Sequence, residues 1–179
     1  MTAATDFAAL LSESVAAFNQ FRAEHQDDEV VLTGVDLRHR NLAGADFSRA
    51  VLFETDLSWS DLSNANFSNA DLRRSRLEHC NLAGACFDGA RMEHANVRMA
   101  NLEGATLRGV TLRAGDLQGT NLRDAAFNGS NLKRVIFCDA DLTGTVFTGA
   151  DLGEADIRWA TFDLEKMTDA DLSTTRIRY

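Results

Sequence analysis

The feature that most constrains this chain is a five-residue period in its large apolar residues. From Leu32 to Ile177, every fifth residue is Leu, Phe, Ile, Val or Met, over 30 consecutive positions. We call each of these positions a centre. A period of five fits neither an α-helix, with about 3.6 residues per turn, nor the two-residue alternation of a plain strand. It fits a repeating unit in which a short strand is followed by a corner.

The residues just before each centre support this unit. The residue two before the centre is Ala in 15 of the 30 repeats, and the residue directly before it is Asp or Asn in 17. In a three-residue strand, the small and the large side chain would point inward and the polar side chain between them outward. Asp and Asn favour the adjoining turn, because their side chains hydrogen-bond to nearby backbone. Arg40 and Glu165 break the small-residue rule. We expect Arg40 to reach the acidic N-terminal segment, and the coil that contains Glu165 to be irregular.

The number of sides in one coil follows from a longer period. Ten glycines lie two residues after a centre, and eight of them fall on two of the four phases of a 20-residue period. These phases predict two corners with positive φ, as in a type II turn. One coil is then four repeats, and 30 repeats make about 7.5 coils in a rod roughly 35 Å long. Five of the seven Phe centres are also separated by multiples of 20: Phe47, Phe67, Phe87, Phe127 and Phe147.

The repeat resembles the pentapeptide-repeat family over about four-fifths of the chain. The resemblance implies an all-β solenoid, a right-handed quadrilateral β-helix, over residues 30–179. It also implies similarity to quinolone-resistance proteins that mimic DNA and to cyanobacterial pentapeptide-repeat proteins. The motif is Ala, then Asp or Asn, then Leu or Phe and two variable residues, as in Ala65-Asn66-Phe67, Ala100-Asn101-Leu102 and Ala150-Asp151-Leu152.

Residues 1–29 lie outside the repeat and are predicted to form an amphipathic helix and a connector. Thr5 or Asp6 would cap the start of the helix. We expect the helix to cover the first coil, because the end of a solenoid exposes apolar core and unpaired strand edges. The alternative is a helix that binds a partner. Its apolar residues recur at helical spacing: Phe7, Leu10, Leu11, Val15, Phe18 and Phe21.

At the other end the repeat continues to Ile177. Apolar side chains in an exposed terminal coil would favour pairing with a second copy. We therefore predict a homodimer through the C-terminal coils. The candidate dimer residues are Phe162, Met167, Leu172, Ile177 and Tyr179.

The formal net charge of −9 argues against a protein that binds nucleic acid or an anionic membrane directly, since either would need a basic surface. It permits a protein that imitates a polyanion. No apolar stretch is long enough to span a membrane, and the N-terminus lacks the basic start of a signal peptide. The three cysteines favour a reducing compartment. We expect a cytoplasmic protein.

The sequence offers no constellation for chemistry. His39 and His79 share a column, but they lie two coils apart, about 10 Å, which is too far for one metal ion. There is no glycine-rich phosphate loop. The carboxylates recur with the repeat and are expected to be solvated. We therefore predict no catalytic, cofactor-binding or metal-binding site, and a protein that is not an enzyme.

One candidate surface is an exposed row on the side centred on Leu37. The residues two after each centre stack on adjacent coils there, and Trp59 and Trp159 are the only tryptophans. Exposed aromatic residues are typical of binding hot spots. The alternative is that large side chains at corners simply cover neighbouring turns. The candidate partner surface is His39, Trp59, His79, Met99 and Trp159.

A second candidate surface is the side centred on Leu42. It has five acidic side chains and one basic side chain, Arg123, whereas the other sides carry equal numbers of both signs. This imbalance is what a DNA mimic would need. The candidate acidic face is Asp61, Glu103, Asp124, Asp141 and Asp163.

Three functions fit these patterns. The first is a scaffold or regulator that binds a protein partner of unknown identity. The second, implied by the resemblance, is a DNA mimic that binds DNA gyrase or topoisomerase IV and protects it against topoisomerase poisons. The chain departs from such proteins because it has no loop insertions, no helix after the repeats and only one acidic face. The third is a purely structural module.

Overall fold

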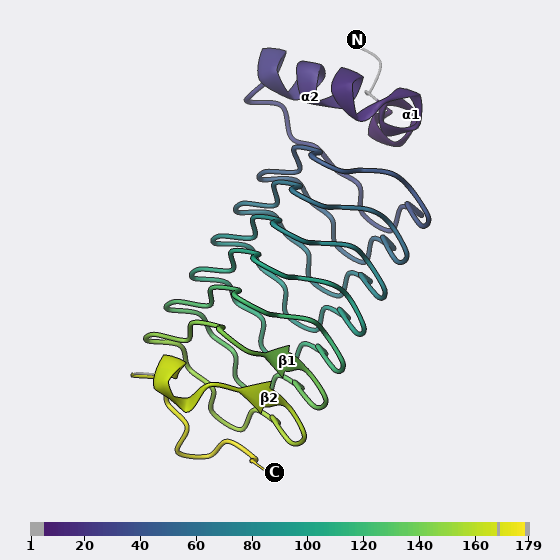
Figure 1. The fold of residues 1–179 in the computed structure, drawn as a ribbon. Helices are drawn as coiled ribbons and strands as arrows, with labels where there is room; N and C mark the ends of the chain where they lie inside the picture. The colour runs from purple at the N-terminus through teal and green to yellow at the C-terminus, as the bar shows by residue number, and fades with distance from the viewer. Residues whose placement is uncertain (1–5, 168, 178–179) are drawn as a thin grey trace.

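The computed structural model describes residues 6–167 and 169–177, and it forms a rod of stacked coils with helices at one end (Figure 1). The predicted β solenoid is confirmed. Its regular elements, in chain order, are α1 (Phe7–Glu13), α2 (Val15–Glu24), β1 (Asp141–Leu142), β2 (Thr161–Phe162) and the 3₁₀-helix η1 (Leu164–Lys166).

Parallel pairing between residues 20 apart holds the coils together. Val31 pairs with Val51, Asp36 with Asp56, and the same spacing recurs at every fifth residue along most of the rod. The short strands β1 and β2 continue the series, with Asp141 opposite Thr161. The chain thus returns to the same place after 20 residues, or four repeats. Each side of a coil contributes one bridge, so the strands are too short to form long ladders.

The corners correct one prediction. Positive φ occurs two residues after the centre at 27 described corners, and only 10 of these residues are glycine. The corners with positive φ are therefore not confined to two sides, as the glycine phases had predicted. The physical reason is that the corner closes a hydrogen-bonded turn on every side. At two such corners, the Ala45 N–H donates to the Leu42 carbonyl at 3.1 Å and the Thr55 N–H donates to the Leu52 carbonyl at 3.2 Å. A type II turn places its third residue at positive φ whatever the side chain.

The residue before the centre folds back onto the turn, as predicted for Asp and Asn. The backbone N–H of Ser63 donates to Asp61 Oδ1 at 3.0 Å, and the N–H of Gln118 donates to Asp116 Oδ1 at 3.0 Å. The same side chains also pair between coils, since Asn81 Nδ2 donates to Asp61 Oδ1 at 3.0 Å. Asp and Asn therefore stabilise both the corner and the stacking.

The centres and the small residues fill the interior of the rod. The stacked rings of Phe47, Phe67 and Phe87 have centroids 5.2 and 4.8 Å apart. Ser and Thr at the small position are buried without loss of hydrogen bonding. Thr55 Oγ1 donates to the Leu32 carbonyl at 2.7 Å, 23 residues earlier. Ser60, Ser130 and Thr145 repeat this contact.

The N-terminal segment is two helices rather than the single helix that the apolar spacing predicted. Ser14 lies between α1 and α2 with extended backbone, and its Oγ accepts from the Ala17 N–H at 3.0 Å. A Ser that caps a new helix cannot continue the previous one. Asp6 caps α1, as predicted, through the Ala9 N–H. Thr5, the other predicted cap, lies outside the described residues. Among the described residues, no helix has the length and apolar character that crossing a membrane requires.

Helix α2 packs on the first coil. Phe18 is fully buried, and its ring lies 5.4 Å from that of Phe47, so it extends the Phe column. Asn19 pairs with the coil as a neighbouring strand would. Its Nδ2 donates to the Gly44 carbonyl, and its Oδ1 accepts from the Asp46 N–H, both at 2.9 Å. Arg22 is buried and donates to the Ser48 carbonyl at 2.7 Å.

Arg40 stays out of the core, as expected, but it does not reach the acidic segment. It is exposed, and its backbone N–H donates to Ser60 Oγ at 3.0 Å. Within the described residues, it makes no ion pair with the segment. Arg49 contacts the N-terminal segment instead, since its guanidinium donates to the Gln26 carbonyl at 2.9 Å.

The coil that contains Glu165 is irregular, as expected. The 3₁₀-helix η1 replaces the usual strand and corner there. The Gly144 N–H, which would pair with a backbone carbonyl in a regular coil, donates to the Asp163 carboxylate at 2.8 Å instead. A charged residue at the small position cannot enter the narrow interior, so the local backbone departs from the repeat.

Candidate functional site

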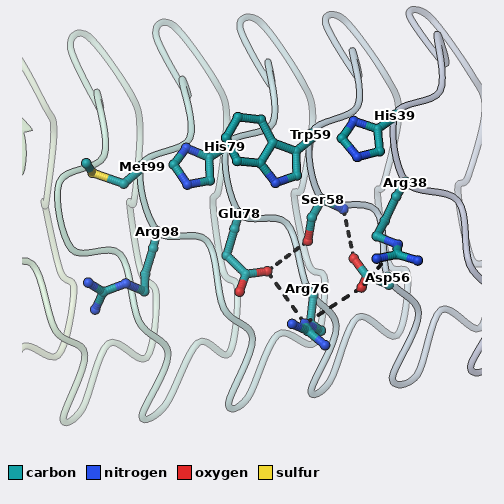
Figure 2. Close-up of a pocket in the computed structure, with 10 residues that line it drawn as sticks. All are labelled: Arg38, His39, Asp56, Ser58, Trp59, Arg76, Glu78, His79, Arg98 and Met99. Atoms are coloured by element: carbon teal, nitrogen blue, oxygen red, sulfur yellow. Dashed lines mark hydrogen bonds and ion pairs between the residues drawn. The ribbon is translucent and has the colours of Figure 1, made fainter.

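Four residues of the predicted row lie next to one another on consecutive coils (Figure 2). The rings of Trp59 and His79 are nearly parallel, with centroids 3.9 Å apart, and those of His39 and Trp59 are 6.2 Å apart. Met99 follows on the next coil, where its sulfur lies over Gly119. Trp59 and Met99 are 55% and 57% exposed, so their apolar surface is open to a partner. We call His39, Trp59, His79 and Met99 the aromatic row.

The aromatic row borders an open hollow of about 450 Å³. The opposite wall of this hollow carries charged side chains in a connected network. The Arg76 guanidinium lies 3.8 Å from both Asp56 and Glu78, and Ser58 Oγ donates to Glu78 at 2.8 Å. Arg38 lies 3.9 Å from Asp56 at one end of the network, and Arg98 lines the hollow at the other end. These side chains hold each other in place, so the hollow is pre-formed on its polar side.

This arrangement combines exposed apolar surface with an ordered polar border. Flat apolar surface bordered by a polar, hydrogen-bonded rim is the pattern of a protein-binding surface. The charged residues of the wall were missed by reasoning from the sequence. Spacings of 18 and 20 residues identify such pairs, because a side chain next to one centre reaches the residues just before and just after the centre in the next coil. Asn96 Nδ2 thus donates to Glu78 Oε1 at 2.7 Å, and Arg98 lies 3.1 Å from Asp116.

Trp159 belongs to the same column but not to the aromatic row. Gly119 and Asp139 occupy the intervening coils, and Trp159 lies five coils from Trp59, about 24 Å at the spacing of stacked strands. It is also 55% exposed, with the Arg158 guanidinium 5.1 Å from the centre of its ring. The predicted partner surface is therefore continuous only from His39 to Met99.

The acidic face is spread along the rod, and several of its members have local partners. Arg123 lies 3.1 Å from Asp141. The pKa of Asp61 is lowered, chiefly by the hydrogen bond from the Ser63 N–H, and that of Asp141 chiefly by the Thr143 hydroxyl. Glu103 accepts a hydrogen bond from the Asn121 side chain at 3.4 Å, and Asp163 accepts one from the Gly144 N–H at 2.8 Å. Asp124 is exposed at a corner.

The predicted dimer residues differ in exposure. Met167 is buried, Phe162 and Leu172 are half-buried, and Ile177 is exposed. Tyr179 lies outside the described residues. Among the described residues, Phe162, Leu172 and Ile177 thus provide the apolar surface at this end, and Met167 does not.

All three cysteines are free thiols, and two of them lie where burial disfavours the reactive thiolate form. Cys80 is buried, its Sγ donates to the Leu57 carbonyl at 3.0 Å, and burial raises its pKa to about 12. Burial also raises the pKa of Cys138. Cys86 is half-buried. In the part of the chain that the structure describes, no three His, Cys, Asp or Glu side chains lie close enough together to hold a metal ion.

Two family models match the chain. One, described as pentapeptide repeats in eight copies, matches residues 31–69, and the other, described as a pentapeptide repeat region, matches residues 60–157. No curated protein matches the chain.

Several solved structures are similar to the chain. The full-length structure of QnrB1, a plasmid-mediated fluoroquinolone resistance protein, is 18% identical, with 84% of this chain and 91% of that chain covered and a TM-score of 0.49. A pentapeptide repeat protein from the Arabidopsis thaliana thylakoid lumen is 25% identical, with 72% of each chain covered and a TM-score of 0.40. HetL, involved in heterocyst differentiation regulation in Nostoc sp. strain PCC 7120, is 24% identical, with 90% of this chain and 93% of that chain covered and a TM-score of 0.31.

Proposed function

Because the chain belongs to the pentapeptide-repeat family, we propose that it is a non-catalytic protein that binds a protein partner through the aromatic row. The observation that carries this proposal is Trp59, which is 55% exposed at a corner with φ of 66°. The fold does not require a tryptophan there, since Gly119 and Asp139 occupy the same corner in later coils. Positive φ is unfavourable for a bulky residue, and exposure leaves its apolar surface in water. A partner that covered Trp59 would remove its apolar surface from water.

The matched pair of tryptophans tests this proposal. Immobilised wild-type protein, Trp59→Ala and Trp159→Ala are compared for the proteins they retain from the source cell extract, identified by mass spectrometry. Trp159 is the control because it has the same residue type, corner position and exposure. We expect at least one protein to be retained by the wild type and by Trp159→Ala but not by Trp59→Ala. Equal retention by all three proteins would show that the aromatic row is not the binding surface.

The alternative function is a DNA mimic that binds DNA gyrase or topoisomerase IV and protects it against topoisomerase poisons. The observation that favours it is the acidic excess on the side centred on Leu42, together with the net charge of −9. The test is gyrase supercoiling and cleavage, with and without a quinolone. Inhibition or rescue at micromolar protein that disappears in the triple variant Asp61→Lys, Asp124→Lys, Asp141→Lys would support this function. No effect at tens of micromolar would exclude it for gyrase.

The finer architecture is also part of the proposal. We infer right-handed coils, about 7.5 of them over residues 30–179, and a cap formed by residues 1–29. The cap is supported by Phe18 and Asn19, which continue the Phe column and the backbone pairing of the first coil. A purely structural module would have the same features, and it would retain no partner in the tryptophan comparison.

Assembly and location are proposed on narrower grounds. The exposed or half-buried side chains of Phe162, Leu172 and Ile177 support a homodimer through the C-terminal coils, and sedimentation equilibrium at tens of micromolar tests it. A monomer at that concentration would rule out the dimer. The free thiols support a cytoplasmic location, which cell fractionation tests.

A further inference from the structure

The side centred on Leu32 has an uneven order of charges along the rod. It carries six acidic and six basic side chains, but the basic ones all lie on four consecutive coils in the middle of the rod. We call them the basic belt: Arg73, Arg74, Arg91, Arg113, Lys133 and Arg134. Only Asp71 and Glu93 lie among them. Glu54 lies at one end of the belt, and Asp151 and Glu154 lie at the other. Counting charges by side conceals this order.

Ion pairs neutralise the ends of the basic belt more fully than its middle. Arg74 lies 3.3 Å from Glu54 at one end, and Arg134 lies 2.9 Å from Glu154 at the other. In the middle, both Asp71 oxygens accept from Arg73, so Arg91 reaches the same carboxylate only at 3.8 Å. Arg113 is exposed and forms no ion pair within the described residues. In the middle of the belt, Arg91 therefore has only a longer contact with a carboxylate that Arg73 already occupies, and Arg113 has no ion-pair partner among the described residues.

A second feature lies at the same place. Phe53, Arg73, Arg74, Glu93 and His94 line an open hollow of about 420 Å³. The guanidinium carbons of Arg73 and Arg74 lie 5.5 and 6.0 Å from the centre of the Phe53 ring, which holds both side chains over the hollow. Both guanidinium groups also pair with carboxylates, Arg73 with Asp71 and Arg74 with Glu54, so this end of the belt is ordered.

Glu93, which lines this hollow, and Thr111 on the next coil each have one buried polar atom. Glu93 Oε2 and Thr111 Oγ1 are inaccessible to solvent and have no hydrogen-bond partner within the described part of the chain. They belong to neighbouring coils at the 18-residue spacing that brings such side chains together elsewhere on the rod. An unsatisfied buried carboxylate oxygen is unfavourable unless a donor reaches it. Because both atoms are inaccessible to solvent, a ligand would contact the exposed arginines of the belt rather than these atoms.

We propose that the basic belt binds a short acidic peptide segment of a partner protein. The peptide carboxylates would pair with Arg91 and Arg113. The four coils of the belt span about 14 Å, which is the length of about five extended residues. A nucleic acid fits less well, because a longer polyanion would meet Glu54 or Glu154. This site is separate from the aromatic row and does not depend on it.

The test is binding of a fluorescein-labelled hexaglutamate peptide, measured by fluorescence anisotropy at 50 mM and 200 mM salt. We expect binding that weakens with salt, and a roughly tenfold loss of affinity in Arg91→Glu, Arg113→Glu. Arg123→Glu, Arg158→Glu is the matched control, because it changes the net charge equally on other sides. Glu93→Gln should tighten binding, since it removes a negative charge from the middle of the belt. Trp59→Ala should bind as the wild type does.

Three outcomes would overturn the proposal. Equal losses in the two double variants would mean that only net charge matters. Tighter binding of a labelled hexathymidylate than of the peptide would assign the basic belt to nucleic acid. No peptide binding at 50 mM salt would leave the basic belt without this role. Circular dichroism of each variant ensures that a lost fold is not read as lost binding, and the exposed positions of Arg91 and Arg113 make the fold robust to their replacement.

Discussion

At the corners of this rod, residues with side chains adopt a backbone conformation that ordinarily favours glycine. Seventeen of the 27 described corner positions with positive φ are not glycine. Asn and Asp tolerate this conformation because their short side chains bond to local backbone. Ala has no such compensation. Ala114, with φ of 57°, is therefore a position where the corner is strained without a benefit from the side chain.

Ala114→Gly should raise the free energy of unfolding by about 1 kcal/mol, because glycine adopts positive φ without the steric cost that alanine has. Urea unfolding followed by circular dichroism measures the change. The control is Ala83→Gly, one residue after a centre, where φ is not positive. There glycine should lower the free energy of unfolding by about 0.5 kcal/mol, because it adds freedom to the unfolded chain. A loss of stability in Ala114→Gly would contradict this account of the corners.

Among the elements, α2 matters most because it behaves as an additional layer of the solenoid. Phe18 occupies the column of Phe47, Phe67 and Phe87, and Asn19 makes two hydrogen bonds to the first coil. The first coil would otherwise expose its apolar interior and unpaired backbone groups. The contact is specific, since an amide side chain here replaces the carbonyl and N–H of a missing strand.

Phe18→Ala should lower the free energy of unfolding by about 3 to 4 kcal/mol, because it leaves a cavity between α2 and the first coil. Thermal and urea unfolding measure the loss. Phe7→Ala is the control, since Phe7 is only partly buried and packs against Phe21 rather than in the Phe column. Phe7→Ala should lower the free energy of unfolding by about 1 kcal/mol. Equal losses in the two variants would show that α2 does not act through the Phe column.

For the whole molecule, the acidic residues link stability to pH. Hydrogen bonds and ion pairs lower the pKa of several carboxylates, among them Asp71, Asp141 and Asp156. Asp156 is a largely buried carboxylate whose pKa is strongly lowered. Both its oxygens accept from the Arg158 guanidinium, at 2.7 and 2.6 Å, and its pKa falls to about 2. A carboxylate with a pKa lower in the folded state than in the unfolded state stabilises the fold above the unfolded value.

The protein should therefore lose stability as the pH falls from about 4 to about 2, with this contribution constant at higher pH. Asp156→Asn should remove about 1 kcal/mol at pH 6, after allowance for solvent screening, and should flatten the profile in that pH window. Arg158→Gln should act in the same direction, since Arg158 is the largest cause of the shift. Thermal unfolding between pH 2 and 7 is the measurement. A profile in Asp156→Asn as steep as that of the wild type would refute the assignment.

The repeat in the sequence determined the solenoid, the positions of the core residues within the coils and the side on which each surface residue of a coil lies. This was possible because a five-residue period admits one alternation of small, polar and large residues, and because the period has no slip of register from Leu32 to Ile177. The column that contains Trp59 could be found in this way, and so could the acidic excess near Asp61. In a repeat, neighbours in space lie at a constant distance in sequence.

Only the tertiary structure decided which of these neighbours touch. It showed that the aromatic row ends at Met99, that positive φ occurs on all sides, and that Ser14 divides the N-terminal segment into two helices. It also revealed the network around Arg76 and the position of Arg113, which has no ion-pair partner among the described residues. These features depend on the contacts that side chains make between coils and on local helix capping. The period constrains neither, because it specifies where each repeat position lies but not which of several neighbours a long side chain contacts.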